Sequence, residues 1–499
     1  MTLLAWANAL LSLFLSVYGI YSLVLAALYL RHRNRCPQAP AVDRRQLPPV
    51  TVQVPVYNEL HVIERVIDAL AALDYPQDKL HIQILDDSTD ETTELGRARA
   101  AMYREQGLDI AILRRDNRSG YKAGALAWGL IRTESDYVAI FDADFRPEPG
   151  FLLQTIPLFL SRPQLGMLQT RWAYLNTDYS PLTRAQALAF DGHYVVEKVG
   201  QAGAGLLLTF NGSAGIWRRQ CIEAVGNWQS DTLCEDLDLS YRAQLAGWSA
   251  LYLRHVTVPA ELPPQMAAFR GQQARWAQGA SQCLRKLAGP IARSASLTLG
   301  QKVMGLAHLS SYLAYPLLTM VLLLSLPLLL VPSSAQLPLG ALGVVYLGQP
   351  LVYALSQRWL YRSNWGGRML RSFPLLALLG MGMTWSNTKA VWRGLTRWGG
   401  PFVRTPKFRI ERRSDGWTAS QYRLGTDPSV VGELALALYM LITTATAIAV
   451  GRYAVVPFTL LSTLAFSYVV WTELTQSRNP GTNAAPTEVA ACGSEPHAG

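Results

Sequence analysis

Two aspartates, Asp142 and Asp144, stand one residue apart directly after the apolar run 137–140. This run is typical of a buried parallel strand, and open α/β sheets bind ligands at the carboxyl ends of their strands. Carboxylate oxygens are the ligands that Mg²⁺ and Mn²⁺ prefer, and both cations also bind substrate phosphates. Taken alone, such a pair is more often part of a solvated loop. Its neighbours in the sequence favour a nucleotide diphosphate donor held through a divalent metal.

Polar side chains also follow two earlier predicted strands. Asn58 and Glu59 come after the strand Val50–Val56, and Asp87 comes after the strand 82–85. Acidic groups gathered at one edge of a sheet repel one another unless a cation lies between them, so packing alone does not explain them.

Lys122 begins a predicted helix behind a glycine turn. Its ammonium group and the helix N-terminus could bind a diphosphate. The alternative is a surface lysine.

Two later motifs add reactive groups. Glu235 and Asp236 open a predicted helix, where one carboxylate could act as a general base, or both could simply stabilise the helix dipole. Gln272, Arg275 and Trp276 share a helix just before an apolar run. Arg275 could stabilise a leaving diphosphate and Trp276 could stack on a sugar, or both could belong to a membrane-interface belt.

The elements that must position these groups alternate along the chain. Strands are predicted at 50–56, 82–85, 110–113 and 137–141, and helices at 62–73, 91–106 and 121–131. This alternation predicts an α/β fold with a mostly parallel, doubly wound sheet. No Gly-x-Gly-x-x-Gly follows the first strand, which argues against a classical dinucleotide site.

The composition adds a membrane region. Half of the 499 residues are hydrophobic, and the mean hydropathy of +0.12 is high for a soluble enzyme. Five apolar runs each approach or exceed the roughly 20 residues that cross a bilayer as a helix. They lie at 3–30, 304–331, 337–355, 430–450 and 453–471. One such run could be a buried core helix, but five favour an α-helical transmembrane region.

Charge around these runs predicts their orientation. No basic residue precedes the first run and three arginines follow within 31–35, which predicts an anchor with a cytoplasmic carboxyl end. The segment 374–383 is short and has basic residues on both sides, as in an interfacial or re-entrant helix. The expected order is an anchor (1–31), a cytoplasmic catalytic domain (36–300), a transmembrane hairpin (301–356), a cytoplasmic stretch (357–428), a second hairpin (429–472) and a disordered tail (473–499).

The net charge is +10, and the basic residues flank the apolar runs. They therefore suit anionic lipid headgroups of the inner or plasma membrane, and no nucleic-acid partner is expected. Five cysteines (Cys36, Cys221, Cys234, Cys283 and Cys492) fit no metal-ligand spacing and are expected to be free thiols.

In their order, these motifs resemble family 2 glycosyltransferases of the membrane synthase type. They are Pro55-Val56-Tyr57-Asn58-Glu59, Asp86-Asp87-Ser88, Lys122-Ala123-Gly124, Asp142-Ala143-Asp144, Glu235-Asp236 and Gln272-x-x-Arg275-Trp276. Longer stretches at 85–90, 116–126, 140–145 and 210–218 are similar to the cellulose-synthase-like A group of mannan and glucomannan synthases. Cys234 stands where the family usually has threonine, but both following acids are kept.

The resemblance implies a GT-A fold, inverting transfer from a nucleotide diphosphate sugar, and a role for each matched residue. The donor would be held by Tyr57, Asn58, Glu59, Asp87, Lys122, Asp142 and Arg275, and Mg²⁺ or Mn²⁺ by Asp144 with Asp142. Asp236 would be the catalytic base, and the acceptor would meet Asn211, Gly212, Glu235, Gln272 and Trp276.

Phe402, Thr405 and Lys407 resemble the gating loop that covers the nucleotide in cellulose synthases. Closure of such a loop over the donor would exclude water and suppress hydrolysis. The alternative is an ordinary basic loop beside the membrane.

The expected function is processive extension of a β-linked polysaccharide from GDP-mannose, with UDP-glucose the next candidate donor, and with possible translocation of the chain. One alternative is a single transfer to a membrane lipid such as diacylglycerol. Another is a non-catalytic export or scaffold subunit, which the intact acidic motifs disfavour. The oligomeric state is not predicted.

Overall fold

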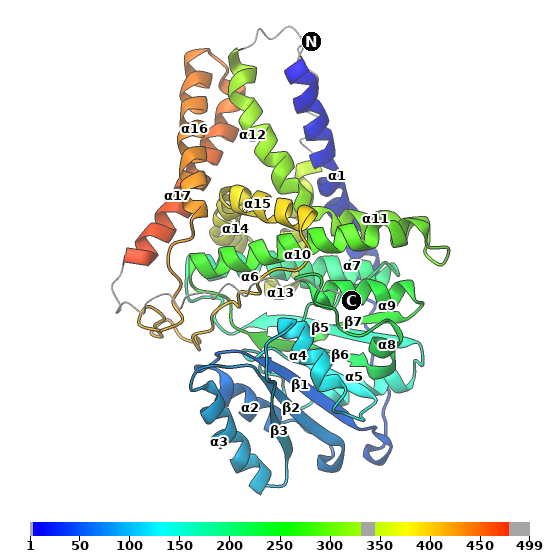
Figure 1. Cartoon of the computed structure of the whole chain (residues 1–499). Helices are drawn as coiled ribbons and strands as arrows, with labels where there is room; N and C mark the ends of the chain where they lie inside the picture. The colour runs from blue at the N-terminus through cyan, green and yellow to red at the C-terminus, as the bar shows by residue number, and fades with distance from the viewer. Residues whose placement is uncertain (1–2, 331–344, 479–499) are drawn as a thin grey trace, which may run out of the picture.

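The computed structural model describes residues 3–330 and 345–478. A sheet with its covering helices forms one end of the molecule, and long helices stand upright at the other end (Figure 1). Between these two parts, several helices lie across the foot of the upright ones.

Seven strands form one mixed sheet in the order β3-β2-β1-β4-β6-β5-β7. They are β1 (Val50–Val56), β2 (Leu80–Asp86), β3 (Asp109–Arg114), β4 (Tyr137–Ile140), β5 (Leu165–Tyr174), β6 (Gly215–Arg218) and β7 (Ser249–Ala260). The strands β1 to β4 are parallel, and β6 runs antiparallel to both β4 and β5. The four predicted strands are confirmed to within three residues at each end.

Helices cover both faces of the parallel half, which explains why its strands are continuous apolar runs. The alternate valines Val50, Val52 and Val54 of β1 are fully buried, as are the residues of β4. The covering helices are α2 (Ile63–Ala71), α3 (Thr92–Glu105), α4 (Tyr121–Leu130) and α5 (Phe151–Leu160). This packing holds the carboxyl ends of β1, β2 and β4 at one edge.

The other half of the domain carries mostly helices. They are α6 (Pro181–Asp191), a π-helical turn (Gly192–Glu197), α7 (Lys198–Gly203), α8 (Arg219–Ala224), α9 (Glu235–Leu245) and α10 (Met266–Arg293). Ser180 caps α6 in a capping box with Thr183, and Pro181 occupies the first turn. The long helix α10 lies at the junction with the upright helices (Figure 1).

Within residues 3–330 and 345–478, four stretches are helical, long and apolar enough to cross a membrane. They are Leu3–His32, Ser311–Leu330, Ser429–Ala449 and Tyr453–Ser477. They comprise α1 (Leu3–His32), α12 (Ala314–Leu330), α16 (Ser429–Ala449) and most of α17 (Val456–Arg478). The expected span at 337–355 lies partly outside the described residues, and its remainder enters α13 (Gly348–Tyr361).

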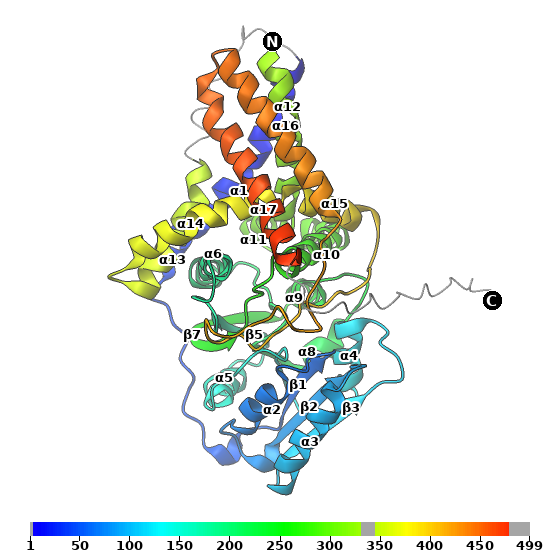
Figure 2. The ribbon, with the colours of Figure 1, turned by 90° about the vertical axis from the view of Figure 1, so that its left-hand side faces the viewer.

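Three further helices are α11 (Leu299–Leu309), which precedes α12, and α14 (Trp365–Gly382) and α15 (Thr384–Thr396), which follow α13. Figure 1 shows α11 and α15 lying across the foot of the upright helices, and Figure 2 shows α13 and α14 slanting away from them. The short apolar segment 374–383 belongs to α14.

Helix α17 continues to Arg478, so the tail predicted from 473 begins too early. The cause is a set of contacts with α10. Glu473 lies 2.6 Å from the buried Arg270 guanidinium, which also lies 2.8 Å from Glu433 of α16. The Gln476 side chain accepts a hydrogen bond from the backbone N–H of Met266 (2.7 Å). These contacts fix α10 to the α16–α17 pair. The rest of the predicted tail lies outside the described residues.

Candidate active site

One cavity at the carboxyl edge of β1, β2 and β4 gathers the predicted site residues. Its lining includes Tyr57, Glu59, Asp87, Lys122, Asp142, Asp144, Asn211, Gly212, Glu235, Asp236, Gln272, Arg275, Trp276, Phe402, Thr405 and Lys407. Asn58 is the predicted residue that is not in this lining. Its side chain bonds to Thr89 instead, accepting from the backbone N–H at 2.8 Å, and its backbone adopts a positive φ of 54°.

Lys122 connects Asp142 to the acidic start of α9. Its Nζ donates to Asp142 Oδ1 at 2.6 Å and to the Gly212 carbonyl at 2.9 Å, and lies 3.9 Å from Glu235. Burial alone would lower the pKa of this ammonium group, but the carboxylates of Asp142 and Glu235 raise it. Lys122 is therefore charged and positioned where a diphosphate beside Asp142 would meet it.

Asp144 has a lysine partner of its own. Lys407 Nζ lies 2.8 Å from Asp144 Oδ2, which also accepts the backbone N–H of Glu261 at 3.0 Å. Asp142 and Asp144 offer the hard oxygen ligands that suit Mg²⁺ or Mn²⁺. Within the described residues, no group of three His, Cys, Asp or Glu side chains could hold a metal. The two aspartates would thus fit a metal that completes its coordination with phosphate oxygens and water.

Asp236 lies at the start of α9, with Oδ1 accepting the backbone N–H of Leu237 at 2.8 Å. Gly212 packs tightly against it. A Cβ at that glycine would stand 3.1 Å from Asp236 Oδ2 and 3.3 Å from Lys122 Nζ, and the glycine φ of +79° is unfavourable for other residues. Gly212 therefore leaves space for the Asp236 carboxylate and the Lys122 ammonium group, which a larger residue would crowd. The departure at Cys234 leaves α9 without a side-chain cap but keeps both acids in the cavity.

The segment 402–407 contributes Phe402, Arg404, Thr405 and Lys407 to the lining of the cavity. The Phe402 ring stacks with Tyr121 at a centroid distance of 6.1 Å, and the Arg275 guanidinium lies 4.6 Å from the Phe402 ring centre. Arg404 lies 3.4 Å from Glu59. Phe402 and Lys407 thus contact the groups expected to bind the donor. Thr405 is buried in the lining.

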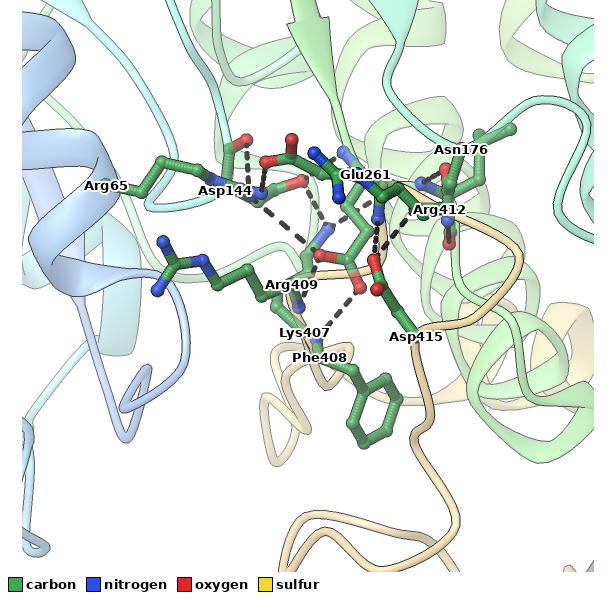
Figure 3. Close-up of polar contacts among 11 residues, drawn as sticks. Arg65, Asp144, Asn176, Glu261, Lys407, Phe408, Arg409, Arg412 and Asp415 are labelled. Carbon is green, nitrogen blue, oxygen red and sulfur yellow. Dashed lines mark hydrogen bonds and ion pairs between the residues drawn. The ribbon is translucent and has the colours of Figure 1, made fainter.

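Glu261, which follows β7, anchors this segment. It was not predicted from the sequence. Its carboxylate accepts the backbone N–H groups of Phe408 (2.8 Å) and Arg409 (2.9 Å), as Figure 3 shows. Burial raises the pKa of Glu261 to about 7, although Lys407 opposes the shift. The available signal was its position in the Glu-Leu-Pro stretch just before α10.

We expect Glu261→Gln to loosen the segment 402–409. The neutral amide keeps one acceptor and turns an N–H group toward the second backbone N–H, so a charge-assisted hydrogen bond worth about 1.5–3 kcal/mol is lost. Trypsin should then cut near Arg404 to Arg409 faster, and the donor KM should rise by roughly tenfold. Glu411→Gln, which removes only the partly exposed partner of Arg65, is the matched control. Unchanged cleavage and KM would contradict the anchoring role.

An aromatic wall also lines the cavity and was not predicted. Trp172 and Tyr174 of β5 and Phe190 of α6 join Trp276 of α10. Phe190 meets Trp276 edge-on at 5.8 Å between ring centres, and it lies 5.8 Å from Tyr174. Flat aromatic faces of this kind suit the apolar faces of sugar rings.

Part of the chain matches a known protein family. Residues 48–279 match the model described as glycosyltransferase like family 2. This segment is a family 2 glycosyltransferase domain. The glycosyltransferase domain contains the acidic motifs and Arg275 and Trp276, while Lys407 lies beyond it. The match confirms the predicted family for residues 48–279, and the seven-stranded sheet confirms the predicted α/β fold class.

The matches to two plant proteins are longer than this domain. The chain is 37% identical over 307 residues to a probable glucomannan 4-beta-mannosyltransferase 10 of Arabidopsis thaliana, covering 59% of this chain and 55% of that protein. It is 36% identical over 360 residues to a probable glucomannan 4-beta-mannosyltransferase 3 of Oryza sativa subsp. japonica, covering 71% and 64%. The chain thus spans less than two thirds of the length of either relative.

A solved structure shares the fold of the glycosyltransferase domain. It is the mannosyltransferase PcManGT of Pyrobaculum calidifontis, determined in complex with GDP-Man and Mn²⁺. The two structures superpose with a TM-score of 0.52 at 22% sequence identity, over 72% of this chain and all of that one. At this identity the likeness concerns the fold.

Electrostatics at the start of α9 predict a pH dependence. Burial raises the pKa of Asp236, and burial with the Asp236 charge raises that of Glu235 to about 7, while Lys122 opposes both shifts. If Asp236 is the base, activity falls as pH drops and the carboxylate takes up a proton, so the acid limb of kcat/KM should lie at higher pH than the pKa of an exposed aspartate. Lys122→Gln should move that limb to higher pH, because the opposing charge is gone. A limb that stays in place or moves down would contradict the assignment.

Proposed function

We propose that the protein is a processive, inverting hexosyltransferase that extends a β-linked polysaccharide from a nucleotide diphosphate sugar. The observation that carries the proposal is that Asp142, Asp144, Asp236 and an aromatic wall line one cavity in a family 2 glycosyltransferase domain. A metal-binding pair, a base and a surface for sugar rings are the parts that glycosyl transfer requires.

The proposed reaction is one in-line displacement. An acceptor hydroxyl gives its proton to the Asp236 carboxylate and attacks C1 of the donor hexose from the face opposite the diphosphate. The bond from C1 to the diphosphate oxygen breaks, and the configuration at C1 inverts. Lys122 and Arg275 stabilise the negative charge that develops on the leaving diphosphate. A metal held by Asp142 and Asp144 would supply further positive charge to the same oxygens.

The relatives suggest the donor. The plant proteins are named glucomannan 4-beta-mannosyltransferases, and the solved mannosyltransferase was determined with GDP-Man and Mn²⁺. We therefore favour GDP-mannose as donor, UDP-glucose as the second choice, and Mn²⁺ or Mg²⁺ as cofactor. Trp276 and the aromatic wall would hold the growing chain, with Asn211, Gln272 and Glu235 nearby in the same lining.

The helices support an inner-membrane enzyme with a cytoplasmic catalytic domain. The start of α1, the end of α12 and the α16–α17 connection lie at the end of the molecule farthest from the sheet (Figure 1). This is the side that the charge pattern assigns to the outside. Helix α10, which carries Gln272, Arg275 and Trp276 of the cavity lining, lies at the foot of these helices (Figure 1), so the same enzyme could pass its product across the membrane.

The test uses the full chain, purified in nanodiscs with Mn²⁺ or Mg²⁺. Radiolabelled GDP-mannose and UDP-glucose are offered in parallel, and label is counted in polymer and in the lipid extract. Polymer from GDP-mannose supports the whole proposal, and polymer from UDP-glucose changes only the donor. Label confined to lipid replaces polymer synthesis by single transfer to a glycolipid. No transfer from either sugar overturns the proposal.

A further inference from the structure

A second cavity, separate from the glycosyltransferase site, opens where α1 and α13 meet the edge of the sheet. Its volume is about 290 Å³. It is lined by Tyr29, Arg33, Asn34, Arg254, Leu355, Arg358, Trp359 and Arg362. The lining therefore has four arginines and no acidic residue.

The arginines come from three different parts of the chain. Arg33 and Arg358 lie at or just beyond the carboxyl-terminal ends of α1 and α13, where cations favourably meet the helix dipole. Arg254 belongs to β7, the edge strand of the sheet. The helix dipole explains the arginines at the ends of α1 and α13. It does not explain why β7 contributes Arg254 to the same cavity.

Most of the hydrogen-bonding capacity of these arginines is unused in the part of the chain that the structure describes. The side chains of Arg33, Arg358 and Arg362 form no ion pair or hydrogen bond with a described residue. Arg254 donates from Nη2 to the Arg33 carbonyl at 2.9 Å, and its guanidinium also forms a hydrogen bond with the Tyr29 side chain, while its buried Nη1 has no acceptor among the described residues. A buried guanidinium nitrogen with no acceptor indicates that an anion completes the site.

Aromatic groups in the lining indicate the level of the cavity relative to the membrane. The Trp359 ring lies 4.3 Å from the Arg254 guanidinium and 5.7 Å from that of Arg171 on β5. Tyr29 lies in the last turns of α1, a helix apolar enough to span a membrane. Arginine with tryptophan and tyrosine at the end of a spanning helix marks the level of lipid headgroups.

We propose that this arginine cavity binds the phosphate headgroup of an anionic membrane lipid, with the acyl chains lying along α1 and α13. The bound phosphate would join α1, α13 and β7, and so fix the catalytic sheet against the membrane. A lipid is favoured over free phosphate because the cavity opens beside a membrane helix and includes apolar Leu355 and Trp359 in its lining.

The test measures lipid binding and needs no enzymatic activity. The full chain is purified in zwitterionic detergent, phosphatidylglycerol or phosphatidylcholine is added, and bound lipids are counted by native mass spectrometry. The pocket variant is Arg33→Gln with Arg358→Gln. The control is Arg31→Gln with Arg371→Gln, which removes the same charge from exposed arginines outside the cavity lining. Equal melting temperatures establish that both variants are folded, and Arg358→Gln alone serves if the double variant is not.

The expected result is one tightly bound phosphatidylglycerol, whose affinity falls by roughly tenfold or more in the pocket variant and stays unchanged in the control. If both variants lose the same affinity for phosphatidylglycerol, the lipid is held by general attraction to basic residues, and the proposed site is wrong. Displacement of the lipid by inorganic phosphate at comparable concentration would also overturn the lipid assignment and leave an anion site. Because the readout is binding, failure here leaves the proposed transferase reaction untouched.

Discussion

Asp236→Asn is expected to abolish sugar transfer while leaving donor binding nearly intact. The amide cannot take up the proton of the acceptor hydroxyl, and general-base catalysis contributes roughly 10²–10⁴-fold in rate. The substitution keeps the size of the side chain, and its Oδ1 still accepts the Leu237 backbone N–H. Donor binding should persist because Lys122, Asp142 and Asp144 are unchanged. Rates come from labelled product per unit time, and binding comes from calorimetric titration with GDP-mannose.

Asp231→Asn is the control for this variant, since Asp231 pairs with Lys286 and does not line the cavity. It should retain wild-type turnover. Near-normal turnover in Asp236→Asn would show that another group is the base. Glu235 would then be the next candidate, because its carboxylate lies in the same cavity with a raised pKa of about 7.

Asp144→Ala is expected to impair both metal-dependent donor binding and transfer. The change removes a buried carboxylate that the metal would need, and it leaves the Lys407 ammonium without its partner at 2.8 Å. Changes around metal ligands already cost 10–100-fold in affinity, so loss of the ligand itself should weaken Mn²⁺-dependent binding of GDP-mannose by roughly 100-fold or more.

Calorimetric titrations with and without Mn²⁺ separate this effect from general damage. The wild type should bind the donor more tightly with the metal, and Asp144→Ala should show little difference between the two conditions. Asp136→Ala, at the other end of the same strand, is the control and should behave like the wild type. If Asp144→Ala still binds the donor more tightly with Mn²⁺, Asp144 is not a metal ligand.

The sequence predicted the parallel half of the sheet well because its strands are buried on both faces and end in polar motifs. Asp142 and Asp144 could be placed because they follow the apolar run 137–140, which fits a strand within the βα alternation. The other half was missed. Strand β6 has only four residues and runs antiparallel, and it lies between β4 and β5, so no local pattern reveals it.

Contacts between distant parts of the chain explain the remaining omissions. Lys407 meets Asp144 across 263 positions of sequence, and Glu261 meets Phe408 across 147. Hydrophobic periodicity carries no information about such pairs. Phe402 and Lys407 were suggested by a motif, whereas the Glu261 anchor has no motif of its own. Asn58 is a residue that a motif suggested but that the structure does not bring into the cavity. The motif assigns Asn58 to the donor, whereas its side chain bonds to Thr89.

The most direct test of polymer synthesis by the Asp236 site is enzymatic digestion of the product. Wild-type protein and Asp236→Asn are incubated with labelled GDP-mannose and Mn²⁺, and the insoluble material is treated with β-mannanase. We predict that the wild type yields labelled polymer that β-mannanase releases as short oligosaccharides, and that the variant yields none. Labelled material from the wild type that resists β-mannanase, or equal polymer from both proteins, would contradict the account.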